Sequence, residues 1–143
     1  MSDIHIDVGE LRFTGRWEIN APVSCAWLKS RLPLEGTMLQ ARWSGEAGWS
    51  PLRTELRLDP ENATTHPKPG QILLYGGPAS EPELLLPYGM CAFAYQGGPL
   101  CGNHLVTLEQ TPQQLRTLGE LLQLKGAQSF RITDATERTN RPR

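Results

Sequence analysis

Short apolar runs separated by glycine and proline constrain the fold of this chain more than any other feature. The 143 residues include 14 glycines and 12 prolines, and both residue types favour turns and interrupt regular structure. The runs between them have the length and alternation of strands, and only two segments have helical periodicity. We therefore predict a mainly β protein, a closed β-barrel capped at its ends by two helices.

The pattern of apolar residues places most of the strands. Segment 4–8 alternates apolar and polar residues, and after a turn at Gly9 the segment 11–17 returns as the second strand of a hairpin. Further strands are predicted over residues 38–45, 51–58, 72–75, 83–88 and 128–132. The sequence GEAGWS, residues 45–50, is rich in turn-forming residues and is predicted to be a turn.

Two helices are predicted from capping signals and spacing. The first has Asn20 as its N-cap and Pro22 in its first turn, and it ends before Pro33. Its buried stripe is predicted to consist of Val23, Ala26, Trp27 and Arg31. The second follows a capping box formed by Thr111 and Gln114. Its apolar residues at helical spacing are Leu115, Leu118 and Leu122.

The bulk properties indicate one cytoplasmic domain. The formal net charge is −1, so the chain lacks the excess of positive charge that binding to nucleic acid or to an anionic membrane would require. No apolar run reaches the roughly 20 residues that span a bilayer, and the acidic N-terminus is unlike a signal peptide. Three cysteines without metal-ligand spacing favour a reducing compartment. We predict one barrel domain over residues 1–133 and a flexible tail over residues 134–143.

The segment Gly89–Thr107 contains glycines and other small residues, and near its end an asparagine carries a side-chain amide. The spacing between these residues is informative. The residues concerned are Gly89, Met90, Ala94, Gly97, Gly102, Asn103 and His104. In these residues the segment resembles the core of cyclophilins, with Tyr95, His104 and Val106 where that family has asparagine, glutamine and a ring. The longer stretch Glu61–Thr107 resembles a bacterial family of uncharacterised cyclophilin-like proteins. The resemblance implies a cyclophilin-like barrel with His104 and Val106 facing a groove and Ala94 and Tyr95 at its rim.

Cyclophilins are prolyl isomerases, which must lower a barrier of roughly 18 to 20 kcal/mol. They clamp the proline ring in an apolar pocket while an arginine hydrogen-bonds the prolyl nitrogen. This chain has no arginine between Glu61 and Tyr95, and the ring of the pocket is replaced by Val106. Prolyl isomerisation is therefore an alternative and not the leading prediction.

The leading prediction is a barrel that binds, and can hydrolyse or cyclise, a small amide-like metabolite in a groove around His104. A histidine with a nearby carboxylate can act as a general base near neutral pH, so His104 and Glu83 are the predicted catalytic residues. The predicted ligand-binding residues are Glu61, His66, Tyr75, Tyr88, Ala94, Tyr95, Asn103 and Val106. For most of these residues the alternative is a structural role, in a turn, at the edge of a strand or at the edge of the core.

No metal ion or cofactor is expected, because the chain has three histidines and neither an HExxH nor a CxxC spacing. Trp43 and Trp49 flank a loop, and exposed tryptophans mark ligand grooves or subunit contacts. A homodimer is accordingly a second expected interaction besides a small molecule. The third interpretation is a noncatalytic interaction subunit with a flat apolar patch, and the sequence does not separate it from the first.

Overall fold

The computed structural model describes residues 1–136. In chain order the elements are β1 (Ile4–Val8), β2 (Leu11–Trp17), α1 (Pro22–Ser30), β3 (Leu34–Gln40), β4 (Gly45–Pro51), β5 (Ala63–Thr64), β6 (Gln71–Tyr75), β7 (Glu83–Cys91), β8 (Ala94–Tyr95), β9 (Gly98–Pro99), β10 (Gly102–Leu108), α2 (Pro112–Lys125) and β11 (Gln128–Asp134). Most of the predicted tail, from residue 137 on, lies outside the described residues. No helix in the described part of the chain has the length and apolarity that crossing a bilayer requires.

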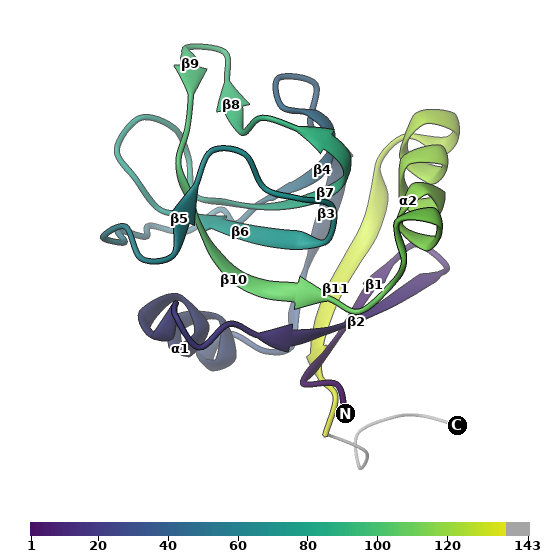
Figure 1. Ribbon diagram of the computed structural model, residues 1–143, viewed down its shortest axis with the longest axis horizontal. Helices are drawn as coiled ribbons and strands as arrows, with labels where there is room; N and C mark the ends of the chain where they lie inside the picture. Colours follow the sequence, from purple (N-terminus) through teal and green to yellow (C-terminus); the bar gives the residue numbers. More distant parts are fainter. Residues whose placement is uncertain (137–143) are drawn as a thin grey trace.

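Eight antiparallel strands form a closed barrel (Figure 1). Their order is β2-β1-β11-β3-β4-β7-β6-β10, and β10 pairs back with β2 from Val106↔Trp17 to Leu108↔Gly15. The short strand β5 pairs with the first residues of β10, ahead of this seam. Each of the eight strands thereby has a neighbouring strand on both sides. The predicted mainly β barrel with two helices is confirmed.

Inward-facing side chains fill the barrel. In β1, Ile4, Ile6 and Val8 are fully buried, and the two polar residues between them are partly exposed. The same alternation places one set of side chains from β6 and β7 in this inner cluster. These residues are Ile72, Leu74, Leu84 and Leu86.

A second, smaller hydrophobic cluster lies on the outer face of β4, β6 and β7. Its members include Leu73, Tyr75 and Leu85 from the strands and Phe93 and Leu100 from the chain after β7. The segment 91–102, which contains the β8–β9 hairpin, folds back over this face, and Phe93 N donates a hydrogen bond to Thr65 O at 2.7 Å. Because side chains alternate along a strand, Glu83 shares the outer face with Leu85.

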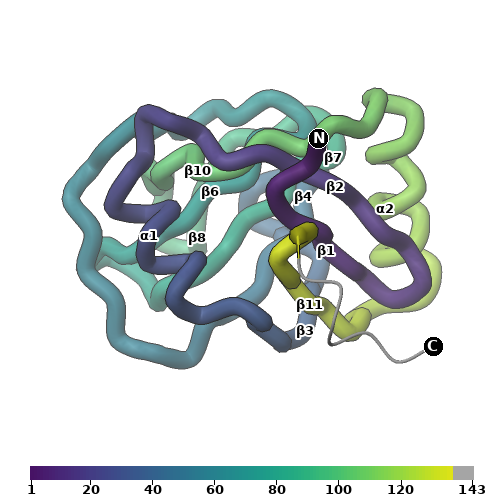
Figure 2. The backbone as a smooth tube through the Cα atoms, turned by 90° about the horizontal axis from the view of Figure 1, so that it is seen from below, coloured from purple at the N-terminus to yellow at the C-terminus, as the bar shows by residue number. Residues whose placement is uncertain are grey.

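Helix α2 forms as the sequence predicts. The Thr111 side chain accepts a hydrogen bond from Gln114 N, and the Gln114 side chain accepts one from Thr111 N, which completes the capping box. Its three leucines at helical spacing are buried against β3, β4 and β7. Gly119 lies against the Tyr88 ring, with which an added Cβ would clash. Figures 1 and 2 show α1 and α2 on opposite sides of the barrel.

Helix α1 exists, but its predicted cap and buried stripe are wrong. The N-cap is Ala21, which makes no side-chain capping bond, and the carboxylate of Glu61 accepts hydrogen bonds from Ser24 N at 2.6 Å and Val23 N at 3.4 Å instead. The buried residues are Ser24, Cys25 and Leu28. Val23 is 61% exposed, because the polar bonds made by Ser24 turn that side of the helix inward.

The predicted turn at residues 45–50 is instead part of strand β4, and residues 52–58, predicted to be a strand, form no regular element. Packing explains the first difference. An added Cβ on Gly48 would lie 2.7 Å from Met38 Sδ and 3.0 Å from Leu122 Cδ1, so a glycine allows β4 to approach β3 and α2 closely. The leucines of the second segment still pack against the inner core.

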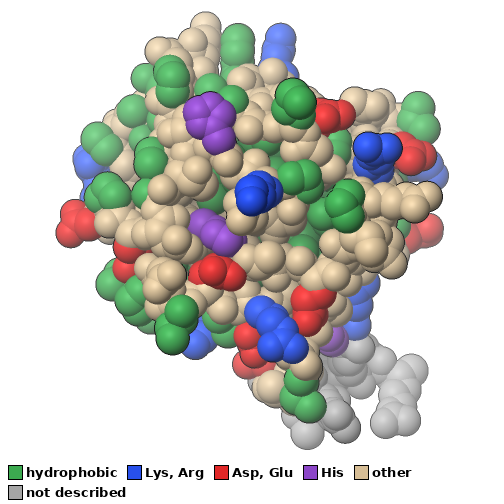
Figure 3. Space-filling view, viewed as in Figure 1, with side chains coloured by type: hydrophobic (Ala, Val, Ile, Leu, Met, Phe, Trp, Pro, Cys, Tyr) green, Lys and Arg blue, Asp and Glu red, His purple; other side chains and the backbone are tan. Residues whose placement is uncertain are grey.

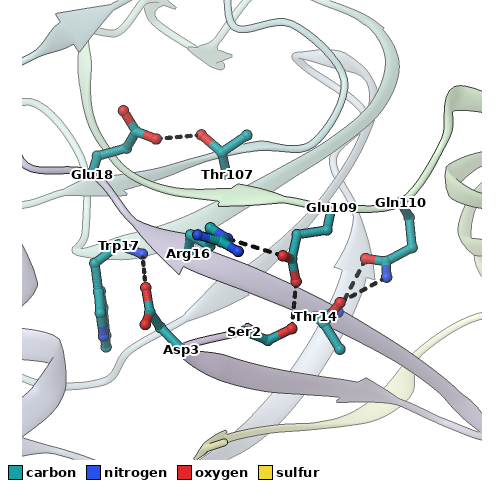
Figure 4. A network of polar contacts seen from close by, with 9 residues as sticks. All are labelled: Ser2, Asp3, Thr14, Arg16, Trp17, Glu18, Thr107, Glu109 and Gln110. Atoms are coloured by element: carbon teal, nitrogen blue, oxygen red, sulfur yellow. Dashed lines mark hydrogen bonds and ion pairs between the residues drawn. The ribbon is translucent and has the colours of Figure 1, made fainter.

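The surface carries charges of both signs, which are interspersed on the face shown in Figure 3. Polar side chains also join the strands at the seam where β10 meets β2 (Figure 4). There Thr14 N donates to Gln110 Oε1 at 3.0 Å, Arg16 Nε to Glu109 Oε2 at 3.1 Å, and Thr107 Oγ1 to Glu18 Oε2 at 2.7 Å. These bonds satisfy polar groups at the place where the barrel closes.

Candidate functional site

A cavity of about 290 Å³ opens on the outer face of the barrel, between the turn 41–44 and strand β8. Its size is at the small end of the range for ligand sites. Aromatic side chains line it from three segments: Trp43, Trp49 and Tyr95. Three charged side chains also line it: Arg42, Glu81 and Glu83. We call this cavity the Glu83 pocket.

Glu83 is the most unusual group in the pocket. It is the first residue of β7, pairs with Tyr75 of β6 and Pro51 of β4, and is only 7% exposed. No hydrogen bond to its carboxyl is formed by the described residues. Because no fully enclosed side-chain oxygen or nitrogen in the described part of the chain lacks a partner, the carboxyl oxygens must reach the open space of the cavity.

Burial raises the pKa of Glu83 to about 8, and the nearby charge of Glu81 adds to the effect. At neutral pH Glu83 is therefore mainly a carboxylic acid, which can donate a hydrogen bond as well as accept one. Perturbed carboxyl groups inside cavities are typical of binding and catalytic sites.

The aromatic wall is accessible from solvent. Trp43 is 53% exposed, and the guanidinium carbon of Arg42 lies 5.3 Å from the centroid of a Trp43 ring, within the range of a cation–π contact. Trp49 and Tyr95 are half-buried. Planar groups stack well on such surfaces.

Ser44 joins the two sides of the pocket. Its Oγ donates to Ala94 O at 3.1 Å and accepts from Ala94 N at 3.0 Å, while Ser44 O accepts from Ala92 N at 2.9 Å. The turn that carries Trp43 is thus bonded directly to the strand that carries Tyr95. Ala94 and Tyr95, both predicted ligand-binding residues, line the pocket.

Tyr75 supports the pocket without lining it. Its hydroxyl accepts a hydrogen bond from Ala79 N at 3.0 Å, which holds the loop bearing Glu81. Its ring meets Phe93 edge-on at a centroid distance of 5.8 Å. This predicted ligand-binding residue therefore belongs to the outer hydrophobic cluster and not to the lining of the pocket.

His104 lies in a different polar cluster. Its Nε2 is 2.8 Å from Thr107 Oγ1, and that hydroxyl donates to Glu18 Oε2 at 2.7 Å. Because the hydroxyl proton is directed at Glu18, Nε2 carries the proton in this arrangement. Burial lowers the pKa of His104, although Glu18 and a backbone hydrogen bond with Val106 oppose the shift.

The two predicted catalytic residues do not share a cavity. His104 is absent from the lining of the Glu83 pocket, and the carboxylate coupled to it through Thr107 is Glu18. His66, a predicted ligand-binding residue, is exposed and lines a separate shallow depression beside Cys101 and Phe93. In the described residues no three His, Cys, Asp or Glu side chains cluster as metal ligands would.

Glu61 and Asn103 hold α1 on the barrel. Asn103 is 4% exposed, and its Nδ2 donates to Ser24 Oγ at 3.1 Å and Asp59 O at 3.0 Å, while its Oδ1 accepts from Glu61 N at 3.1 Å. All the hydrogen bonds that the structure shows for these two side chains therefore join α1, the loop before β5 and strand β10 to one another.

Val106 and Tyr88 belong to the inner core, with exposed fractions of 0% and 4%. The prediction that Val106 faces the groove with His104 is wrong in this respect, because the register of β10 against β6 shifts between these two residues. Such a bulge reverses the direction of the following side chains. The Tyr88 hydroxyl accepts from Gln40 Nε2 at 3.2 Å, and Gln40 itself lines the Glu83 pocket.

The family model for DUF3830, described as a protein of unknown function, matches residues 4–134. The chain belongs to this family. The resemblance to an uncharacterised family is confirmed to this extent, while the cyclophilin resemblance stays a prediction. No curated protein matches the DUF3830 chain in sequence.

Among solved structures, the DUF3830 barrel is similar to that of McbB in complex with tryptophan. The two superpose with a TM-score of 0.74 at 12% sequence identity, over 96% of this chain and 46% of McbB. The chain thus spans about half the length of that structure. The likeness shows that the DUF3830 chain shares its fold with part of McbB.

Several residues of the pocket were not predicted as site residues. Arg42, Ser44 and Gln96 carry no sequence signal that distinguishes them from ordinary turn residues. Trp43 and Trp49 were noted as candidates for a groove or a subunit contact, and both line the pocket. The available signal was therefore two tryptophans on either side of a short polar loop.

Proposed function

We propose that the DUF3830 barrel binds a small amide-like molecule in the Glu83 pocket. The observation that carries the proposal is a carboxyl group that is 7% exposed, lines a cavity and has no hydrogen-bond partner among the described residues. The carboxyl oxygens open onto the cavity, so a ligand that enters it can hydrogen-bond them in place of solvent. A polar group held in this way at the wall of a cavity favours a ligand with a matching polar atom.

The protonation state of Glu83 favours a neutral carbonyl as that partner. With a pKa raised to about 8, the carboxyl can donate a hydrogen bond to an amide oxygen at neutral pH, and the aromatic wall of Trp43, Trp49 and Tyr95 suits a planar group. McbB, part of which shares this fold, forms a complex with the small molecule tryptophan, which is compatible with the proposal.

In this proposal Glu83 also transfers a proton to or from the bound molecule. A carboxyl group with a pKa near neutrality is an efficient general acid or base. Hydrolysis or cyclisation of an amide would use it in this way. His104 is not required for binding in this proposal, because it contributes nothing to the lining of the pocket.

The test is a ligand-observed NMR screen of small amides against the full chain and three variants. Glu83→Leu should abolish binding of the hits, because it removes the carboxyl and leaves an apolar side chain. The matched control Glu120→Gln changes an exposed carboxyl on α2 and should leave binding unchanged. Loss of the hits in His104→Ala but not in Glu83→Leu would overturn the placement of the site. Incubation of each hit followed by product analysis then tests turnover.

A further inference from the structure

The two oxygens of Glu83 form a matched pair of hydrogen-bonding atoms. Neither is used by the described residues, and both belong to a side chain that lines the pocket. A protonated carboxyl presents one donor and one acceptor side by side, at the spacing of the C=O and N–H groups of an amide in the cis arrangement. A trans amide directs these two groups in opposite directions.

We propose that the ligand of the Glu83 pocket is a planar cyclic amide, whose cis C=O and N–H groups form two parallel hydrogen bonds with the Glu83 carboxyl. This inference rests on the proposed function and specifies its substrate class. Lactams, imides and other heterocycles that contain a ring amide belong to this class.

The cost of the cis arrangement explains why a secondary amide that binds at two points is cyclic. For a simple secondary amide the cis form is disfavoured roughly 70-fold in population. An open-chain secondary amide therefore loses that factor when it binds Glu83 at two points, whereas a ring holds the amide in the cis form covalently. The rigid ring also loses little conformational entropy on binding.

The walls of the pocket are consistent with a flat and neutral ligand. Trp43, Trp49 and Tyr95 provide the aromatic surface on which a ring can stack. The other charged side chains that line the pocket are Glu81 and Arg42. The Arg42 guanidinium lies over Trp43 at 5.3 Å, and the charge of Glu81 acts against ionisation of Glu83.

Three probes of similar size test the inference by calorimetry on the full chain at pH 6.5. The first is 2-quinolinone, a planar cyclic amide; the second is 1-methyl-2-quinolinone, in which the N–H is blocked; the third is acetanilide, an open-chain amide. We expect 2-quinolinone to bind at least tenfold more tightly than either of the others. The methylated probe leaves one oxygen of the Glu83 carboxyl unpaired, and acetanilide has to adopt the cis form.

Glu83→Gln provides the matched protein control. A carboxamide also presents one acceptor and one donor side by side, so this variant should bind 2-quinolinone within about threefold of the wild-type affinity. The wild-type affinity should fall about tenfold per pH unit above pH 8, where Glu83 loses its proton. The Gln variant should show no such fall.

Three outcomes would overturn the inference. Equal affinity for the three probes, with binding still lost in Glu83→Leu, would exclude the two-point contact and leave the proposed function intact. Failure of 2-quinolinone while other amides from the screen bind would do the same. If neither the three probes nor any amide of the screen binds, the inference and the proposed function are both overturned. The comparison of probes on the wild-type chain does not depend on whether any variant folds.

Discussion

Glu83 shows how the surroundings of one residue change its chemistry. On a strand that faced solvent it would be an ordinary carboxylate, but the segment 91–102 covers the outer face of β7 and leaves the side chain 7% exposed. Burial and the charge of Glu81 then raise its pKa to about 8. The carboxyl group that favours ligand binding therefore also lowers the free energy of unfolding at high pH.

The effect on stability can be measured with Glu83→Gln. The folded protein holds the Glu83 proton up to about pH 8, whereas the unfolded chain loses it near the ordinary value of 4.5. Between these values the folded state binds more protons, so the free energy of unfolding should fall by up to about 1.4 kcal/mol per pH unit as pH rises, and level off above pH 8. Urea unfolding at pH 5, 7 and 9 should show this fall in the wild type and a much flatter profile in the variant. Parallel profiles would contradict the assignment.

For single residues, the sequence predicted which residue types belong to a site better than it predicted which of them lie together. Glu83, Ala94 and Tyr95 were predicted site residues and all line one pocket. Glu61 and Asn103 were predicted on the same grounds, but they bind α1 and the neighbouring loop. A linear sequence shows no difference between a polar side chain that faces a cavity and one that faces a helix end, because only packing decides it.

Helix α1 depends on a residue almost forty positions away. Its N-terminal N–H groups have no local cap, and the Glu61 carboxylate accepts hydrogen bonds from two of them. Burial raises the pKa of Glu61, but the hydrogen bonds from Ser24 and Val23 outweigh this and hold it below the ordinary value. Capping signals within a helix were sufficient for α2, where Thr111 and Gln114 are local, and they failed for α1.

Glu61→Ala should therefore lower the free energy of unfolding by about 1 kcal/mol, as the loss of an N-cap does. The control Glu61→Gln keeps an acceptor oxygen but loses the charge that interacts with the helix dipole, so its loss should be smaller. Denaturant unfolding at neutral pH measures both. If Glu61→Ala were as stable as the wild type, the long-range cap would have no energetic role.

For the whole molecule, the short strands and frequent turns were sufficient to predict a closed barrel, because few other arrangements remove so many strand edges. The exact strands were not all predictable. Gly48 lies in β4 because Met38 and Leu122 approach it closely, and that reason exists only once the barrel and α2 are packed together. The pocket likewise depends on the packing of the turn 41–44 against β8 through Ser44.

The most direct test of a protonated Glu83 as the ligand-binding group is a carbon NMR titration of its carboxyl, from pH 4 to pH 10, in the free protein and with 2-quinolinone. Glu83→Gln assigns the resonance by removing it. We expect a midpoint near 8 in the free protein and a higher midpoint with the ligand, because binding to the acid form stabilises the proton. A midpoint near 4.5, the ordinary glutamate value, that the ligand does not move would contradict this role of Glu83.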